Sequence, residues 1–97
     1  MVKFALYAHL KAKPGREAEV KNFLASALPM VQDERGTRTW YAIREDDSNF
    51  SIFDIFDDEA SRNEHLEGKV AAALKAKASE LFAEPPAIHK LDIIAAK

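Results

Sequence analysis

One stretch of the chain, residues 49–68, constrains the fold more than any other because it passes from a strand to a helix without a connecting loop. Its sequence is NFSIFDIFDDEASRNEHLEG. Side chains of a strand alternate between two faces, and here both faces carry large apolar groups: Phe50, Ile52 and Phe56 on one, Phe53 and Ile55 on the other. A strand of this kind is expected to be buried on both sides. The rest of the chain, or a partner, must therefore cover each face.

The second half of the same stretch predicts a short helix. Asp57 or Asp58 can cap its first turn with a side-chain oxygen. We expect the helix to run to about Glu67 and to stop at Gly68 in a left-handed C′ conformation, which glycine adopts most easily. His65, in the last turn, is the one side chain of this helix that titrates near neutral pH.

The length and composition favour one small cytoplasmic domain. A chain of 97 residues supports one modest core, so residues 1–97 are expected to form a single domain. Fourteen Lys and Arg against sixteen Asp and Glu give a net charge of −2, which attracts neither nucleic acid nor an anionic membrane. The lack of cysteine excludes a disulfide framework and a thiolate nucleophile. The first residues include Lys3 and Lys11 and predict neither a signal peptide nor a membrane span.

The remaining elements follow from the hydrophobic periodicity. Further strands are predicted at residues 2–11, 38–45 and 87–96. Helices are predicted from about residue 16 to 31 and at 69–83, and Pro29 should kink or restart the first of them. The order strand, helix, strand, strand, helix pair, strand is the ferredoxin-like α+β pattern with a four-stranded antiparallel sheet. Right-handed crossovers would place all helices on one face of that sheet.

The other face of the predicted sheet has no helix to cover it. It would carry Tyr7, His9, Ile94 and one apolar side of the strand at residues 50–57. An exposed apolar face of this size usually marks an interaction surface. A second copy of the chain, packed sheet to sheet about a twofold axis, would cover it, so we expect a homodimer.

Four segments together resemble a known family. They are KPG at 13–15 before a helix, GTRTWYAIRE at 36–45, FSIFDIFDDEASRNEHLEG at 50–68, and a closing strand after Pro85-Pro86. From about Val2 to Ala96 the chain resembles the antibiotic biosynthesis monooxygenase domain, a member of the dimeric α+β barrel superfamily. That family commonly has a glutamate at the position of Asp54 and a histidine before leucine in the short helix, as in His65-Leu66.

The resemblance implies a pocket between sheet and helices in each subunit. It also implies oxidation of quinols, anthrones or related polyphenols by O₂, without flavin or metal as cofactor. Such chemistry needs an apolar cavity, a base that generates an electron-rich phenolate, and hydrogen bonds that place the substrate. One branch of the superfamily degrades haem with an Asn, Trp and His set. The corresponding positions here are Ala8, His65 and Lys75, so we do not expect haem cleavage.

His65 and Asp54 are the candidate catalytic residues. An unperturbed imidazole titrates near the working pH of an enzyme, so His65 can serve as a base, although a histidine in a last helical turn also favours the helix dipole. Asp54 lies between Ile52 and Phe56, and burial there would raise its pKa and make it a second acid or base. Alternatively, Arg38, Arg44 or a backbone donor satisfies its carboxylate.

Four aromatic residues are candidates for stacking on an aromatic substrate: Trp40, Tyr41, Phe53 and Phe56. Aromatic residues at strand positions are more often part of the core, which leaves both roles open. The three histidines at 9, 65 and 89 have no metal-ligand spacing, and we expect His89 to be a core or rim residue.

Three functions remain open on this basis. The first is a cofactor-independent monooxygenase acting on a quinol-like or polyphenolic small molecule, with His65 as base. The second is a non-catalytic dimeric module that binds an apolar small molecule or serves a stress or detoxification role. The third is an isomerase or lyase of the same fold, since each needs only a base in a dry pocket.

Overall fold

Four antiparallel strands form the sheet of the computed structural model, which describes residues 3–97. They are β1 (Phe4–Lys11), β2 (Thr37–Arg44), β3 (Asn49–Phe56) and β4 (Ala87–Asp92). Their order across the sheet is β2-β3-β1-β4, so the two strands that are adjacent at the centre are β3 and β1. The ferredoxin-like α+β fold expected from the sequence is confirmed.

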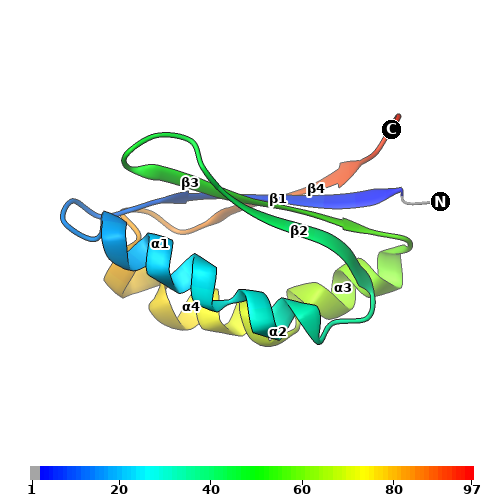
Figure 1. Cartoon of the computed structure of the whole chain (residues 1–97), viewed down its shortest axis with the longest axis horizontal. Helices are drawn as coiled ribbons and strands as arrows, with labels where there is room; N and C mark the ends of the chain where they lie inside the picture. Colours follow the sequence, from blue (N-terminus) through cyan, green and yellow to red (C-terminus); the bar gives the residue numbers. More distant parts are fainter. Residues whose placement is uncertain (1–2) are drawn as a thin grey trace.

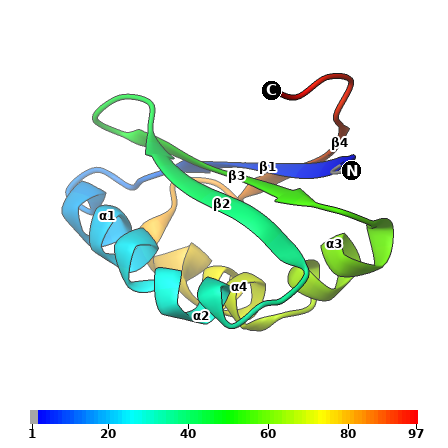
Figure 2. The ribbon, with the colours of Figure 1, turned by 45° about the vertical axis from the view of Figure 1, so that its right-hand side comes forward.

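The helices all lie on one face of this sheet, as Figures 1 and 2 show. They are α1 (Glu17–Ser26), α2 (Leu28–Gln32), α3 (Glu59–Leu66) and α4 (Lys69–Leu81).

The predicted restart at Pro29 is confirmed, because α1 ends before Ala27 and Pro29 stands in the first turn of α2. Asp58 caps α3 by accepting a hydrogen bond from the Ser61 backbone amide at 2.8 Å. Within residues 3–97, no helix has the length and apolar character needed to cross a lipid bilayer.

The core fills the space between the helix-facing side of the sheet and the helices. Its buried members are Ala8, Leu10, Ala12, Val20, Leu24, Ala27, Val31, Phe50, Ile52, Val70, Leu74, Leu81 and Phe82. The apolar stripes predicted for the two long helical segments supply about half of this cluster, at spacings of three and four residues. Burial of this apolar surface is the main stabilising contribution to the fold.

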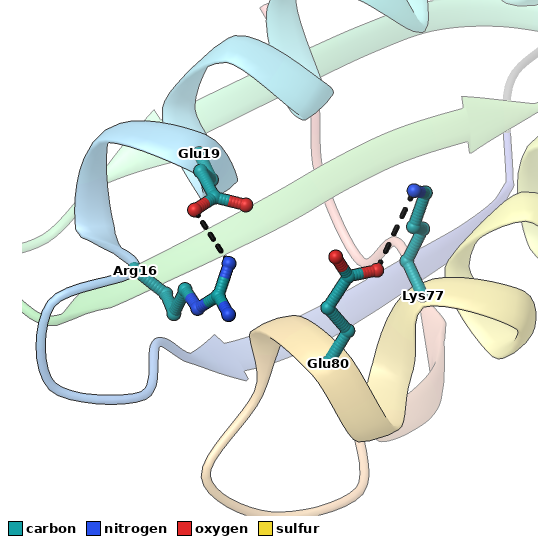
Figure 3. A network of polar contacts seen from close by, with 4 residues as sticks. All are labelled: Arg16, Glu19, Lys77 and Glu80. Carbon is teal, nitrogen blue, oxygen red and sulfur yellow. Dashed lines mark hydrogen bonds and ion pairs between the residues drawn. The ribbon is translucent and has the colours of Figure 1, made fainter.

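Charged pairs on α1 and α4 contribute little by comparison. Arg16 and Glu19 are 2.6 Å apart, and Lys77 and Glu80 are 3.5 Å apart (Figure 3). Each pair joins residues three apart in sequence, and all four side chains are about half exposed. Exposed pairs of this kind are worth roughly 0.3–0.5 kcal/mol each. Apolar packing, and not these ions, therefore holds the two helices against the sheet.

The second face of the sheet is open. Tyr7 on β1 stands opposite Phe53 on β3, which stands opposite Tyr41 on β2, so aromatic side chains form a row across three strands. Tyr41 is 54% exposed and the neighbouring Ile43 41%. In the described part of the chain no helix covers this face (Figure 2). We call it the open face, and its presence confirms the bare face expected from the sequence.

Two predictions about the open face and the last strand are wrong in detail. The last strand was expected to span residues 87–96, but β4 ends at Asp92 because its partner β1 begins at Phe4, directly opposite. Ile94 therefore lies beyond the strand and is 97% exposed, so it is not part of the open face. His89 contributes from β4 instead, opposite Tyr7 and exposed. Val2, predicted to begin the first strand, lies outside the described residues.

The predicted left-handed conformation of Gly68 is also wrong. Its φ of −86° is an ordinary value, and Gly68 serves as the N-cap of α4. The chain continues from α3 into α4 with one residue, Glu67, between the helix and this cap, so a left-handed turn is not needed to end α3. Gly15 is the glycine of the described chain with positive φ, in the turn before α1.

We predict that Leu10→Ala lowers the free energy of unfolding by about 2–5 kcal/mol, because Leu10 is fully buried and its truncation leaves a cavity. Leu28→Ala is the matched control, since Leu28 is 43% exposed and its loss should cost no more than about 0.5 kcal/mol. Urea unfolding followed by Trp40 fluorescence measures both. Equal costs for the two variants would contradict this description of the core.

Candidate functional site

A cleft of about 500 Å³ opens where the connection from α2 to β2 meets α3 and the start of α4. Its walls include six polar or charged side chains that bear on the chemistry: Glu34, Arg35, Thr37, Glu64, His65 and Lys69. The close approach of the two walls depends on Gly36. A Cβ on Gly36 would lie 2.6 Å from the Ser61 side chain, so any larger residue would push the start of β2 away from α3.

His65 lies at the floor of this cleft. It comes from the last turn of α3, and its side chain is only 8% exposed. One ring nitrogen, Nδ1, contacts Oε1 of Glu34, and the other, Nε2, lies 2.8 Å from Oδ2 of Asp54. The Phe56 ring packs beside the imidazole with 5.4 Å between ring centroids. His65 is thus held between two carboxylates, and we call Asp54, His65 and Glu34 the acid–base array.

Asp54 forms the buried end of the array. It projects from the helix-facing side of β3, where its side chain is 2% exposed. Neither of its oxygens has a well-directed hydrogen bond within residues 3–97, so the carboxylate depends on its charge contact with His65. The alternative that Arg38 or Arg44 satisfies Asp54 is wrong. Arg38 pairs with Asp57 at 3.4 Å, and Arg44 stands over the Phe50 ring.

Glu34 forms the cleft end of the array and was not among the candidates predicted from the sequence. Its Oε1 accepts a hydrogen bond from the Thr37 hydroxyl at 2.7 Å in addition to its contact with His65. Its side chain is 21% exposed, more than that of either other member. Residues 34–37 have the composition of a turn, and the residue types found in such turns are usually explained by local backbone geometry. No signal in the sequence relates Glu34 to His65, 31 residues further along the chain.

The two buried members of the array have perturbed pKa values. Burial raises the pKa of the Asp54 carboxyl above its ordinary value, and Glu34 adds to that rise, while the contact with His65 partly offsets it. Burial by itself lowers the pKa of His65. The polar contacts with Asp54 and Glu34 and the negative charges of these two residues outweigh burial, so the net pKa of His65 is raised. An imidazole with a raised pKa at the floor of a cleft can exchange a proton with a bound molecule.

The structure brings some of the predicted site residues together and separates others. His65, Asp54 and Phe56 are in contact or adjacent, and Trp40 stands opposite Asp54 on β2, partly buried against the core. Tyr41 and Phe53 lie on the open face, on the far side of the sheet from His65. None of the four predicted aromatic side chains lines the cleft, so their role in stacking on a substrate stays a prediction. Among residues 3–97 no group of three or more His, Asp or Glu side chains could hold a metal ion.

Comparison with solved structures identifies similar proteins. A protein of unknown function from Nitrosomonas europaea is 50% identical, with a TM-score of 0.98 over 100% of this chain and 94% of that chain. Candidate antibiotic biosynthesis monooxygenases from Caulobacter crescentus and Bordetella bronchiseptica are 18% and 20% identical, with TM-scores of 0.82 and 0.79. The matches cover 97% and 98% of this chain, and 92% and 100% of the other two. No family model and no curated protein matches the chain.

We predict that the stability of the protein falls as the pH rises above about 6.5. Folded His65 binds its proton more tightly than unfolded His65, so its stabilising contribution is complete below the unfolded pKa of 6.5 and is lost through the raised folded pKa. His65→Gln should flatten this part of the curve. Urea unfolding at a series of pH values measures it.

The control for this measurement is His89→Gln, on the open face of the sheet. Its curve should keep the wild-type slope, because His89 lies across the sheet from Asp54 and Glu34. A His65→Gln variant that keeps the full wild-type slope would show that the array does not hold the His65 proton.

Proposed function

The chain belongs to the same family as the Nitrosomonas europaea protein and has the antibiotic biosynthesis monooxygenase-like fold, and from this we propose that it is a monooxygenase. The proposed substrate is a quinol, an anthrone or a similar polyphenol, oxidised by O₂ without flavin or metal in the cytoplasm. The proposal rests mainly on the position of His65, which lies between two carboxylates at the floor of a cleft.

In the proposed reaction the phenolic proton of the bound substrate is lost to the acid–base array, with His65 as the base. The electron pair of the broken O–H bond stays on the substrate, and the resulting phenolate is electron-rich enough to reduce O₂ directly. A quinol and O₂ then give a hydroxyquinone and water, so one oxygen atom enters the ring and the other leaves as water. Asp54 holds the Nε2 side of the imidazole and stabilises the charge that develops on it.

The charged side chains along the cleft suit a polar substrate such as a phenol better than an apolar metabolite. Arg35 and Lys69 bring positive charge to walls that also carry the acidic Asp33, Glu34 and Glu64, and a phenolate oxygen beside either cation would be stabilised. The cleft thus carries more charged groups than the apolar cavity that the resemblance implies. A binding module for an apolar molecule would gain nothing from a buried carboxylate and imidazole, since both are costly to desolvate. The array therefore supports an acid–base role over passive binding.

We also propose that the working form is a homodimer assembled through the open face. The row formed by Tyr7, Phe53 and Tyr41, with the exposed Ile43 and Leu91, is an apolar surface of the type that associating proteins cover. Packing against the same surface of a second copy would bury on the order of 800 Å² per subunit. This contact leaves the cleft accessible, because the cleft lies among the helices on the other side of the sheet.

We predict that wild-type protein accelerates oxygen consumption with menadiol or an anthrone, and that His65→Ala lowers the rate about 10²-fold or more, because it removes the base. An oxygen electrode measures the rate. Glu67→Ala, at an exposed residue outside both the cleft and the open face, is the control and should retain wild-type activity. If the wild type shows no turnover above the uncatalysed oxidation across a panel of quinols, the monooxygenase proposal fails for that class, and the binding module or an isomerase becomes the better account.

We predict that the wild type sediments as a dimer at micromolar concentration and that Phe53→Lys sediments as a folded monomer. Phe53 lies at the centre of the open face, and a lysine there would bury a charge at the interface. Leu28→Lys, on the exposed surface of α2, should remain dimeric. A monomeric wild type would remove the dimer from the proposal.

A further inference from the structure

Neither nitrogen of the His65 ring faces a substrate directly. Nε2 contacts the Asp54 carboxylate on the buried side, and Nδ1 contacts the Glu34 carboxylate on the cleft side. The imidazole side chain itself is 8% exposed. A molecule in the cleft therefore meets the Glu34 carboxylate before it can meet a ring nitrogen.

Glu34 is held in this position by two contacts on one of its oxygens, Oε1. Oε1 accepts the Thr37 hydroxyl at 2.7 Å and contacts His65. Oε2 reaches towards Gly68, where a Cβ would stand only 3.2 Å away. Glycine at residue 68 thus leaves room for the carboxylate, which explains the residue better than the left-handed turn predicted for it. Glu34, Thr37 and Gly68 all line the cleft.

We propose that Glu34 is a catalytic residue that touches the substrate and relays its phenolic proton to His65. This inference rests on the proposed function for the identity of the substrate as a phenol. Glu34, and not His65 or Asp54, then contacts the reacting O–H group. His65 becomes the second proton acceptor, after Glu34.

The relay balances in atoms and charge. Before transfer, one proton is shared in the hydrogen bond between Glu34 Oε1 and His65 Nδ1, and His65 Nε2 carries a second proton beside Asp54, which gives the array a net charge of −1. The substrate O–H bond then breaks as a Glu34 Oε2–H bond forms. The shared proton moves fully to His65 Nδ1, and the electron pair stays on the substrate as phenolate. The array becomes neutral, and the negative charge lies on the substrate in the cleft that Arg35 and Lys69 also line.

The relay is tested with 4-nitrophenol, a phenol that O₂ does not oxidise under these conditions and that absorbs visible light only as the phenolate. The wild type should bind it and raise the phenolate fraction at a pH below the probe's own pKa. Glu34→Gln keeps the size of the side chain and a hydrogen-bonding group near His65 and Thr37, but it cannot carry a proton. We expect this variant to lower the phenolate fraction of bound probe about tenfold or more, equivalent to one pKa unit or more.

The matched control is Glu67→Gln, which removes the same charge from an exposed residue at the end of α3 that does not line the cleft. It should ionise the probe as the wild type does. If Glu34→Gln loses its fold, judged by circular dichroism, Glu34→Ala with added formate serves instead. Formate in the vacated space should restore ionisation if the role is proton transfer, whereas a purely structural role would not be rescued.

The outcomes separate this inference from the monooxygenase proposal. Ionisation by the wild type and its loss in Glu34→Gln support the relay, even if no quinol in the panel is oxidised. Equal ionisation by the wild type and Glu34→Gln overturns the relay and leaves oxidation by His65 alone in place. A wild type that does not raise the phenolate fraction at all also overturns it.

Discussion

The contact between Asp54 and His65 is the interaction on which the rest of the site depends. A carboxylate that is 2% exposed on the helix-facing side of β3 is costly unless a charge or donor compensates it, and His65 is the group placed to do so. This requirement fixes how α3 lies on the sheet, because the last turn of the helix must bring the imidazole over Asp54. It also fixes the orientation of the ring, and so the nitrogen that is left for Glu34.

The two faces of β3 have different surroundings. Asp54 and Phe56 point to the helices and support the candidate site, while Phe53 points to the open face. A change on one face should therefore alter the surroundings of His65, and a change on the other should alter only the open face. This division follows from strand geometry, since adjacent side chains project in opposite directions.

The sequence predicted most of the fold and part of the site, for identifiable physical reasons. Helix stripes and strand alternation are local signals, so the elements, the restart at Pro29 and the capping role of Asp58 could be predicted. His65 stood out because it titrates near neutral pH. Glu34 could not be predicted, since its contact with His65 exists only after the turn at residues 34–37 packs against α3. The end of β4 likewise depends on where β1 begins, which is a property of the assembled sheet.

The early end of β4 has a consequence for aggregation. β4 is an edge strand of the sheet, and an edge strand presents unpaired backbone groups to which another chain can add. Here that edge is six residues long, and Lys90 and Asp92 place charges along it. Short, charged edges resist the growth of continuous intermolecular sheets. The β4 edge of the sheet therefore discourages uncontrolled strand addition more than the eight-residue β2 edge on the other side does.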